Sequence, residues 1–182
     1  MKLETTTIRR LRDALLQSGR RPSLVLSPAY ETLTRAGMLT AEETAALTRV
    51  DPLGETMFLM MSADGRIEET ERDAVRGAIR GLSDGILRSG TINVMLENYA
   101  KRLAESSRDQ RLHEIADEIA DEPSEAEGAF ALAAAIALAD DEITEEENAF
   151  INQLADWFGI AEERANQILD QLDEDGEGAE EE

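Results

Sequence analysis

One acidic stretch of this chain occurs twice, and this repetition limits the folds that the chain can adopt. Residues 63–71 read ADGRIEETE, and 76 residues later residues 139–147 read ADDEITEEE. An apolar run precedes each copy, and an amphipathic helical pattern follows it. The repeated unit is therefore a helix, a short acidic turn and a second helix, and the chain carries two such units.

The first copy has the spacing of the second half of an EF-hand calcium loop. Such a loop has a glycine at its sixth position and a glutamate at its twelfth, and Gly65 and Glu71 fit these positions. Positions one and three would be Met60 and Ser62, which supply almost none of the oxygen ligands that calcium needs, so neither copy is a complete EF-hand. Two half-loops that face each other could still pool their carboxylates into an oxygen-only site for a hard cation. The pooled side chains would be Asp64, Glu71, Asp140 and Glu147.

Helix capping offers a second explanation for the same acids. Thr144 and Glu147 have the spacing of a capping box, and acidic residues favour the first turn of a helix. A third, degenerate copy keeps this cap pattern in Thr40 and Glu43 but has Ala36 in place of the aspartate. Capping does not explain an aspartate directly after a long helix, where the helix dipole disfavours it. The two full copies therefore favour a metal site, although both interpretations stay open.

Two helix–A-D-x-x-I-x-x-x-E–helix units at this spacing, followed by a Gly-Ile turn into a last helix, resemble the tellurite-resistance TerB family. The resemblance covers about residues 50–172. It implies an all-α fold whose pseudo-symmetric halves bring the acidic turns together, and divalent-cation binding by the motif acids. It also implies a role in bacterial metal and stress response beside membrane-embedded partners. The chain departs from the family pattern at Asp141, which replaces the turn glycine, and in its N-terminal residues 1–50.

These patterns predict an all-α fold, a compact bundle of about seven to nine helices built from two pseudo-symmetric helix–acidic turn–helix units. Residues 1–50 are expected to form an N-terminal helical extension that packs on the core, and residues 51–172 the TerB-like helical domain. Residues 173–182 are expected to be a disordered acidic tail, because they are rich in acids and poor in apolar residues. Residues 129–139 are almost entirely apolar, which predicts the central helix of the core.

Local signals predict where individual helices begin and end. Residues 40–49 are expected to form one helix, and residues 51–52 (Asp-Pro) to open the first repeated unit. Ser124 and Glu127 have the spacing of another capping box. Gly159 is expected in the left-handed conformation that ends a helix.

Charge is divided unevenly along the chain. The net charge is −22, and residues 1–112 hold 17 Arg and Lys against 16 acids, whereas residues 113–182 hold 24 acids and Arg164 alone. Such a C-terminal half repels nucleic-acid phosphates and favours cations or a basic protein surface. Without cysteine there is no disulfide or thiolate site. No apolar run approaches the roughly 20 residues that cross a bilayer, so a cytoplasmic protein without membrane insertion is expected.

Together with the resemblance, these observations predict a cytoplasmic divalent-cation-binding helical protein that acts in metal or tellurite stress as a sensor, buffer or assembly module. Calcium is the expected ion, with magnesium as the alternative, bound by the pooled carboxylates while Glu68, Glu145 and Glu146 tune the local charge. Protein partners are expected, including membrane-embedded components of a stress complex. The competing prediction is a metal-independent acidic module that binds other proteins. An enzyme is not expected, because the chain lacks a nucleophile constellation, a phosphate-cradling glycine loop and a His/Cys cluster.

Overall fold

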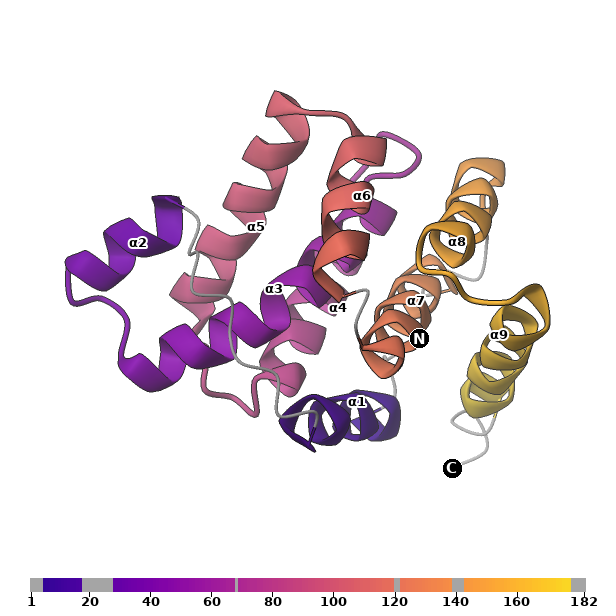
Figure 1. Ribbon diagram of the computed structural model, residues 1–182, viewed down its shortest axis with the longest axis horizontal. Helices are drawn as coiled ribbons and strands as arrows, with labels where there is room; N and C mark the ends of the chain where they lie inside the picture. Colours follow the sequence, from indigo (N-terminus) through magenta and orange to yellow (C-terminus); the bar gives the residue numbers. More distant parts are fainter. Residues whose placement is uncertain (1–4, 18–27, 68, 120–121, 139–142, 178–182) are drawn as a thin grey trace.

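A computed structural model describes residues 5–17, 28–67, 69–119, 122–138 and 143–177 (Figure 1). All regular secondary structure in these residues is helical, so the predicted all-α fold is confirmed. Nine helices are found in the described ranges: α1 (Thr5–Gln17), α2 (Pro28–Arg35), α3 (Ala41–Met61), α4 (Glu69–Leu82), α5 (Ser89–Glu105), α6 (Arg108–Ile119), α7 (Pro123–Ala137), α8 (Glu145–Trp157) and α9 (Glu162–Glu177).

Helices α3 and α7 pack against each other at the centre of the bundle, and the other helices pack around them (Figure 1). Every residue from 128 to 137 in α7 is buried. A helix that is apolar on all sides belongs in the core, and the prediction of a central helix at residues 129–139 is confirmed as far as the described residues reach. Methionines 57, 60 and 61 of α3 are also fully buried, so they fill the core.

Helix α3 passes through the predicted boundary between residues 50 and 51. The sequence predicts a helix over residues 40–49 and a new unit from Asp51 onward, and this prediction is wrong: α3 is continuous, with Pro52 inside it. A proline in a helix interior removes one backbone hydrogen bond and costs about 3 kcal/mol. Here residues 52–61 are all buried, and this burial outweighs that cost. The division into an N-terminal extension and a TerB-like domain therefore falls inside one helix.

A buried polar cluster, the Glu55 cluster, joins α3 to α5 and α6. The Glu55 side chain is 3% exposed, and it accepts hydrogen bonds from Arg111 Nε (2.7 Å), Arg111 Nη2 (2.9 Å) and Arg102 Nη1 (2.5 Å). Arg102 also donates to Asp51 (3.1 Å), and the other carboxylate oxygen of Asp51 accepts the Tyr30 hydroxyl (2.6 Å). A buried carboxylate is tolerated only when it is paired, and this pairing fixes α5 and α6 on α3.

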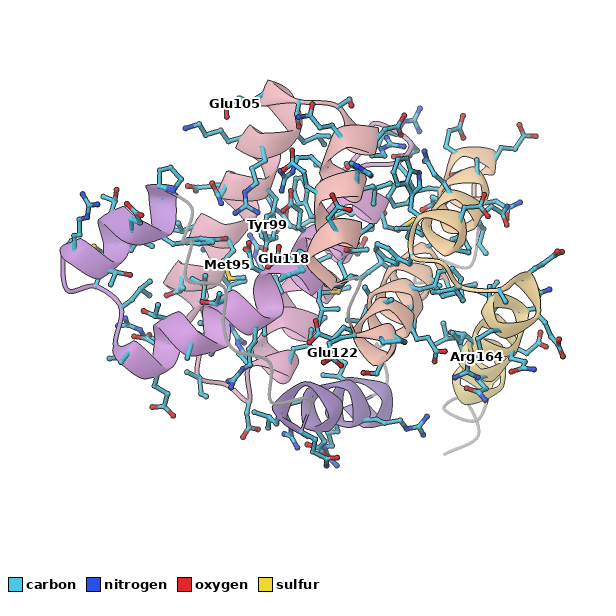
Figure 2. The ribbon with its side chains drawn as sticks, in the orientation of Figure 1. Met95, Tyr99, Glu105, Glu118, Glu122 and Arg164 are labelled. Carbon is cyan, nitrogen blue, oxygen red and sulfur yellow. The ribbon has the colours of Figure 1, made fainter. Side chains whose placement is uncertain are left out.

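Tyr99 reaches from α5 toward α3 and packs beside Gly54 (Figure 2). Its hydroxyl donates to the Asp51 carbonyl (3.2 Å). A Cβ atom at Gly54 would lie 2.7 Å from the Tyr99 hydroxyl and 3.3 Å from Ile79 Cδ1. Because a real Cβ contact is never this short, the close approach of α5 requires glycine at this position of α3.

The N-terminal helix α1 packs on α4 and α7. Ile8 is buried against Gly81 of α4, where a Cβ atom would come within 2.6 Å of the Ile8 side chain. Arg12 of α1 forms an ion pair with Asp84 (2.7 Å) just after α4. A small residue in α4 and one ion pair thus hold α1 on the bundle.

Helix α9 is held on α7 by Arg164, whose Nε and Nη2 donate to the Glu127 carboxylate at 3.0 and 2.7 Å (Figure 2). The predicted capping box of Ser124 and Glu127 is therefore wrong. Helix α7 begins at Pro123, two residues earlier than a cap at Ser124 would allow, and has no side-chain cap. Proline starts a helix by itself because its φ angle is already helical and its missing N–H is not needed there.

Helix α9 also continues into the acidic C-terminal segment. Residues 173–177 belong to this helix, although disorder is predicted for residues 173–182; residues 178–182 lie outside the described ranges. Ile168 is buried, and Leu169 and Leu172 pack against the core. Extending an anchored helix costs far less than starting one, which explains the extra turn.

None of the described helices has both the length and the apolar composition needed to cross a bilayer.

We predict that Gly54→Ala destabilises the protein, because the added methyl group must displace Tyr99 or Ile79. Overpacking of this kind costs about 1–3 kcal/mol, which exceeds the gain of about 1 kcal/mol in helix propensity. Urea unfolding followed by far-UV circular dichroism measures the change. The matched control is Gly77→Ala in α4, where a Cβ atom meets nothing within 4 Å; this variant should be more stable than wild type. Equal effects of the two substitutions would contradict the packing at Gly54.

Candidate functional site

The first acidic turn connects α3 to α4 and is exposed to solvent. Gly65 has a φ angle of +78°, a left-handed conformation that favours glycine. The Arg66 N–H donates to Asp64 Oδ1 at 2.8 Å. The left-handed glycine and the hydrogen bond to Asp64 thus shape the sharp turn between α3 and α4. The interpretation of this turn as half of a calcium loop stays a prediction.

Glu71 lies in the first turn of α4 and is buried, with 7% of its surface exposed. Ile67, in the turn before it, is 47% exposed. Glu68 lies outside the described residues. The first unit thus presents Asp64 to solvent and holds Glu71 against the protein.

The second acidic turn leads into α8, and its described part begins at Ile143. Glu147 Oε2 accepts the Thr144 N–H and the Thr144 hydroxyl, both at 2.8 Å, and the Glu147 N–H donates to Thr144 Oγ1 at 3.2 Å. The predicted capping box is confirmed. Glu145 and Glu146 in the same helical turn are exposed. Asp140 and Asp141 lie outside the described residues.

The degenerate third copy contains a capping box of the same kind but is tied into the protein. Thr40 and Glu43 form this capping box at the start of α3, and the neighbouring Leu39 is buried. The Arg88 guanidinium pairs with Glu43 (2.6 Å) and also donates to the Met38 carbonyl (2.7 Å). The Thr40 N–H, and after it Arg88, hold the pKa of Glu43 below its ordinary value. The acid of this copy is therefore neutralised by an arginine of the same chain.

The two full copies differ from the degenerate copy in exposure and in charge compensation. Ile67 and Ile143 stand at equivalent positions and are 47% and 45% exposed, whereas Leu39 at the corresponding position is 7% exposed. Within the described ranges no arginine or lysine pairs with Glu147 or Asp64. Ile67 and Ile143 thus face solvent, whereas Leu39 of the degenerate copy packs in the core.

Arg108 connects the end of α3, just before the first acidic turn, to α8. From the first turn of α6, its Nη2 donates to the carbonyls of Ala63 (2.9 Å) and Ser62 (3.2 Å) at the end of α3. The same guanidinium lies 5.2 Å from the ring centroid of Phe150 in α8. One side chain therefore spans from the residue before Asp64 to a residue one helical turn after Glu147. No local sequence pattern indicates this role, because the partners of Arg108 lie more than 40 residues away along the chain.

No three His, Cys, Asp or Glu side chains gather as a possible metal site in the part of the chain that the structure describes. The predicted ligand set of Asp64, Glu71, Asp140 and Glu147 includes one residue outside that part. The shared cation site therefore stays a prediction. The only histidine, His113, is exposed on α6 and lies against Trp157.

Comparison with protein-family models matches residues 53–170 to the family described as tellurite resistance protein TerB. The matched range begins inside α3 and ends in α9, so it includes both acidic turns and leaves out α1 and α2. No curated protein and no solved structure matches the chain.

We predict that Thr144→Ala destabilises the protein by about 1 kcal/mol, because it removes the side-chain acceptor that caps α8. The free energy of unfolding in urea measures this loss. Thr40→Ala, in the capping box of α3, is the matched comparison and should cost a similar amount. An unchanged stability of Thr144→Ala would show that the cap does not hold the start of α8.

We predict that the stability contributed by Glu43 depends on pH. The folded-state pKa of Glu43 lies below the unfolded value of about 4.5, so its ionised form stabilises the fold above that pH. This contribution is lost as the pH falls through the folded-state pKa. Glu43→Gln should therefore be less stable than wild type at neutral pH, and the difference should shrink as the solution becomes acidic. Glu42→Gln, at an exposed neighbouring position, is the control and should track wild type at every pH; a constant deficit of Glu43→Gln would contradict the prediction.

Proposed function

This chain belongs to the tellurite resistance protein TerB family, and from that premise and the geometry of its acidic turns we propose that it binds a divalent cation between the two turns. Asp64, Glu71, Asp140 and Glu147 would supply carboxylate oxygens. Glu68, Glu145 and Glu146 would add negative charge around them.

The observation that carries this proposal is the contrast between the full and degenerate copies. The degenerate copy and the second full copy each begin a helix with a capping glutamate, yet within the described ranges Glu43 meets an arginine, Arg88, and Glu147 pairs with no arginine or lysine. The full copies keep an aspartate at the preceding helix end, where the helix dipole disfavours a negative charge. A cation from solution would offset that cost in the full copies, whereas the degenerate copy has Ala36 in place of the aspartate and needs no such ion.

The position of Arg108 gives further support. Its contacts with the Ala63 carbonyl and with Phe150 span the gap between the end of α3 and the second turn of α8. These contacts set the first acidic turn close to the helix that the second acidic turn begins. Two half-loops on one side of the bundle can share an ion, whereas half-loops on opposite sides cannot.

The oxygen-only donor set favours a hard cation. We propose calcium rather than magnesium, because calcium accepts six to eight oxygens in irregular geometry, while magnesium demands a near-ideal octahedron. Two turns on separate elements, of which one lacks the turn glycine at Asp141, suit the less demanding ion.

The competing function is a metal-independent acidic module that binds other proteins. The observation that favours it is the capping role of Glu147, whose Oε2 already accepts two hydrogen bonds from Thr144. In this case the acids start helices and shape the surface charge, and Asp140→Asn would leave the stability unchanged or slightly raise it.

From the description of the family as tellurite resistance proteins, we further propose a role in metal or tellurite stress as a sensor, buffer or assembly module. The role is one of binding, without a chemical reaction. A cytoplasmic location and membrane-embedded protein partners accompany this proposal as predictions.

We predict that the metal-free protein binds calcium with a saturable heat in isothermal titration calorimetry and a rise in melting temperature. Binding to the folded state alone stabilises it by about 2.7 kcal/mol at a hundred times the dissociation constant. Asp64→Asn and Asp140→Asn should each weaken the response, because each removes a charged ligand. Asp170→Asn, on the exposed side of α9, is the matched control and should respond as wild type does. No saturable response at millimolar calcium, or an unchanged response in both turn variants, would overturn the proposal.

A further inference from the structure

Trp157, the only tryptophan of the chain, leaves part of its indole open to solvent at the end of α8. Its exposed fraction is 38%. The His113 ring of α6 meets it edge to face, with ring centroids 5.0 Å apart and an interplanar angle of 71°. His113 supports one edge of the indole, and the remaining indole surface stays available for contact with another molecule.

Two contacts between α6 and α8 build the surface around this indole. Gln153 Nε2 donates to Asp109 Oδ1 at 2.8 Å, and one turn further along both helices His113 meets Trp157. The equal spacing of the two contacts shows that α6 and α8 run in the same direction here, as Figure 1 shows. We call this surface the α6–α8 face; it consists of Asp109, His113, Asp117, Gln153, Asp156 and Trp157.

The carboxylates of the α6–α8 face lack arginine or lysine partners. Asp117 lies 3.7 Å from His113 Nε2, Asp109 accepts from Gln153, and Asp156 is exposed. Within the described ranges no arginine or lysine pairs with any of the three.

Some acids elsewhere on the surface do have basic partners. On α4, Arg76 pairs with both Glu69 (2.9 Å) and Asp73 (2.8 Å). The only basic residue after position 113, Arg164, is held by Glu127. The α6–α8 face is therefore a negatively charged surface with an aromatic ring in it, and no arginine or lysine of the described ranges pairs with its carboxylates.

We propose that the α6–α8 face docks an arginine-bearing basic segment of a partner protein. A guanidinium group is planar and stacks on an indole face, and here it can do so while pairing with Asp117 or Asp156. Charge complementarity selects this occupant: phosphates of nucleic acid or anionic lipid are repelled by 24 acids in residues 113–182, and a second copy of a chain of net charge −22 is repelled too.

This surface is separate from the proposed cation site. Glu145 and Trp157 stand at opposite ends of α8, about 18 Å apart along the helix axis at 1.5 Å per residue. The docking proposal therefore needs no metal, and its test is carried out in the presence of a chelator.

The test uses two synthetic peptides of equal length and charge, one alternating arginine with glycine and the other lysine with glycine. Because Trp157 is the only tryptophan, its fluorescence reports directly on the indole, and calorimetry gives the affinity at several salt concentrations. We expect the arginine peptide to change the indole emission and to bind about two- to fivefold more tightly than the lysine peptide. Both affinities should fall as salt rises.

Matched variants distinguish binding at the α6–α8 face from attraction to the overall negative charge of the protein. Asp117→Asn with Asp156→Asn should weaken binding of the arginine peptide about fivefold. Glu162→Gln with Glu163→Gln, exposed on α9, removes the same charge elsewhere and should leave binding nearly unchanged. Trp157→Leu should abolish the preference for arginine over lysine, with circular dichroism confirming that the variant is folded. Equal losses in the two charge pairs, or equal affinities for the two peptides with wild type, would show diffuse attraction to a polyanion and overturn the proposal.

Discussion

The close packing of α3 against α7 is the constraint on which the rest of this structure depends. Both helices are buried on all sides, α7 through residues 128–137 and α3 through residues 52–61. Burial of this kind is possible only when other helices cover every face, so the pair determines where α4, α5, α6, α8 and α9 can lie. The acidic turns follow these two helices directly. The core therefore sets the first acidic turn at its edge, where Asp64 reaches solvent.

Glu55 is an acidic side chain that this packing buries, and it pairs with arginines. Glu55 stands in the middle of α3 and meets both Arg102 and Arg111. Such a cluster adds little stability over an apolar one of the same shape, but removing one partner is costly. Its effect is to specify position: a carboxylate in the central helix accepts only the arrangement of α5 and α6 that brings both guanidinium groups to it. The planar, multiply donating guanidinium is suited to this, and lysine is not.

Most local signals in the sequence gave correct predictions, with the capping box of Ser124 and Glu127 as an exception, and long-range contacts could not be predicted. The capping boxes at Thr40 and Thr144 and the left-handed Gly159 depend on neighbouring residues alone, and the structure contains all three. The break expected at Pro52 is absent because burial on both sides, which no local pattern reveals, outweighs a missing hydrogen bond. Likewise the partner of Glu55, Arg111, lies 56 residues away. The two aspartates of the candidate site cannot be compared, because Asp140 lies outside the described residues.

The acidic residues discussed above fall into two groups, those that pair with an arginine of the chain and those that do not. Glu43 and Glu127 each have an arginine within the chain, whereas Glu147 and the α6–α8 face have none in the described ranges. Among these uncompensated acids, Glu147 and Asp156 lie toward opposite ends of α8, about 14 Å apart along the helix axis at 1.5 Å per residue. At physiological salt the Debye length is about 8 Å, so a cation at one end is largely screened from a ligand at the other. Helix α8 can therefore present two negatively charged binding surfaces whose occupancies are nearly independent, unless binding at one end moves the helix itself.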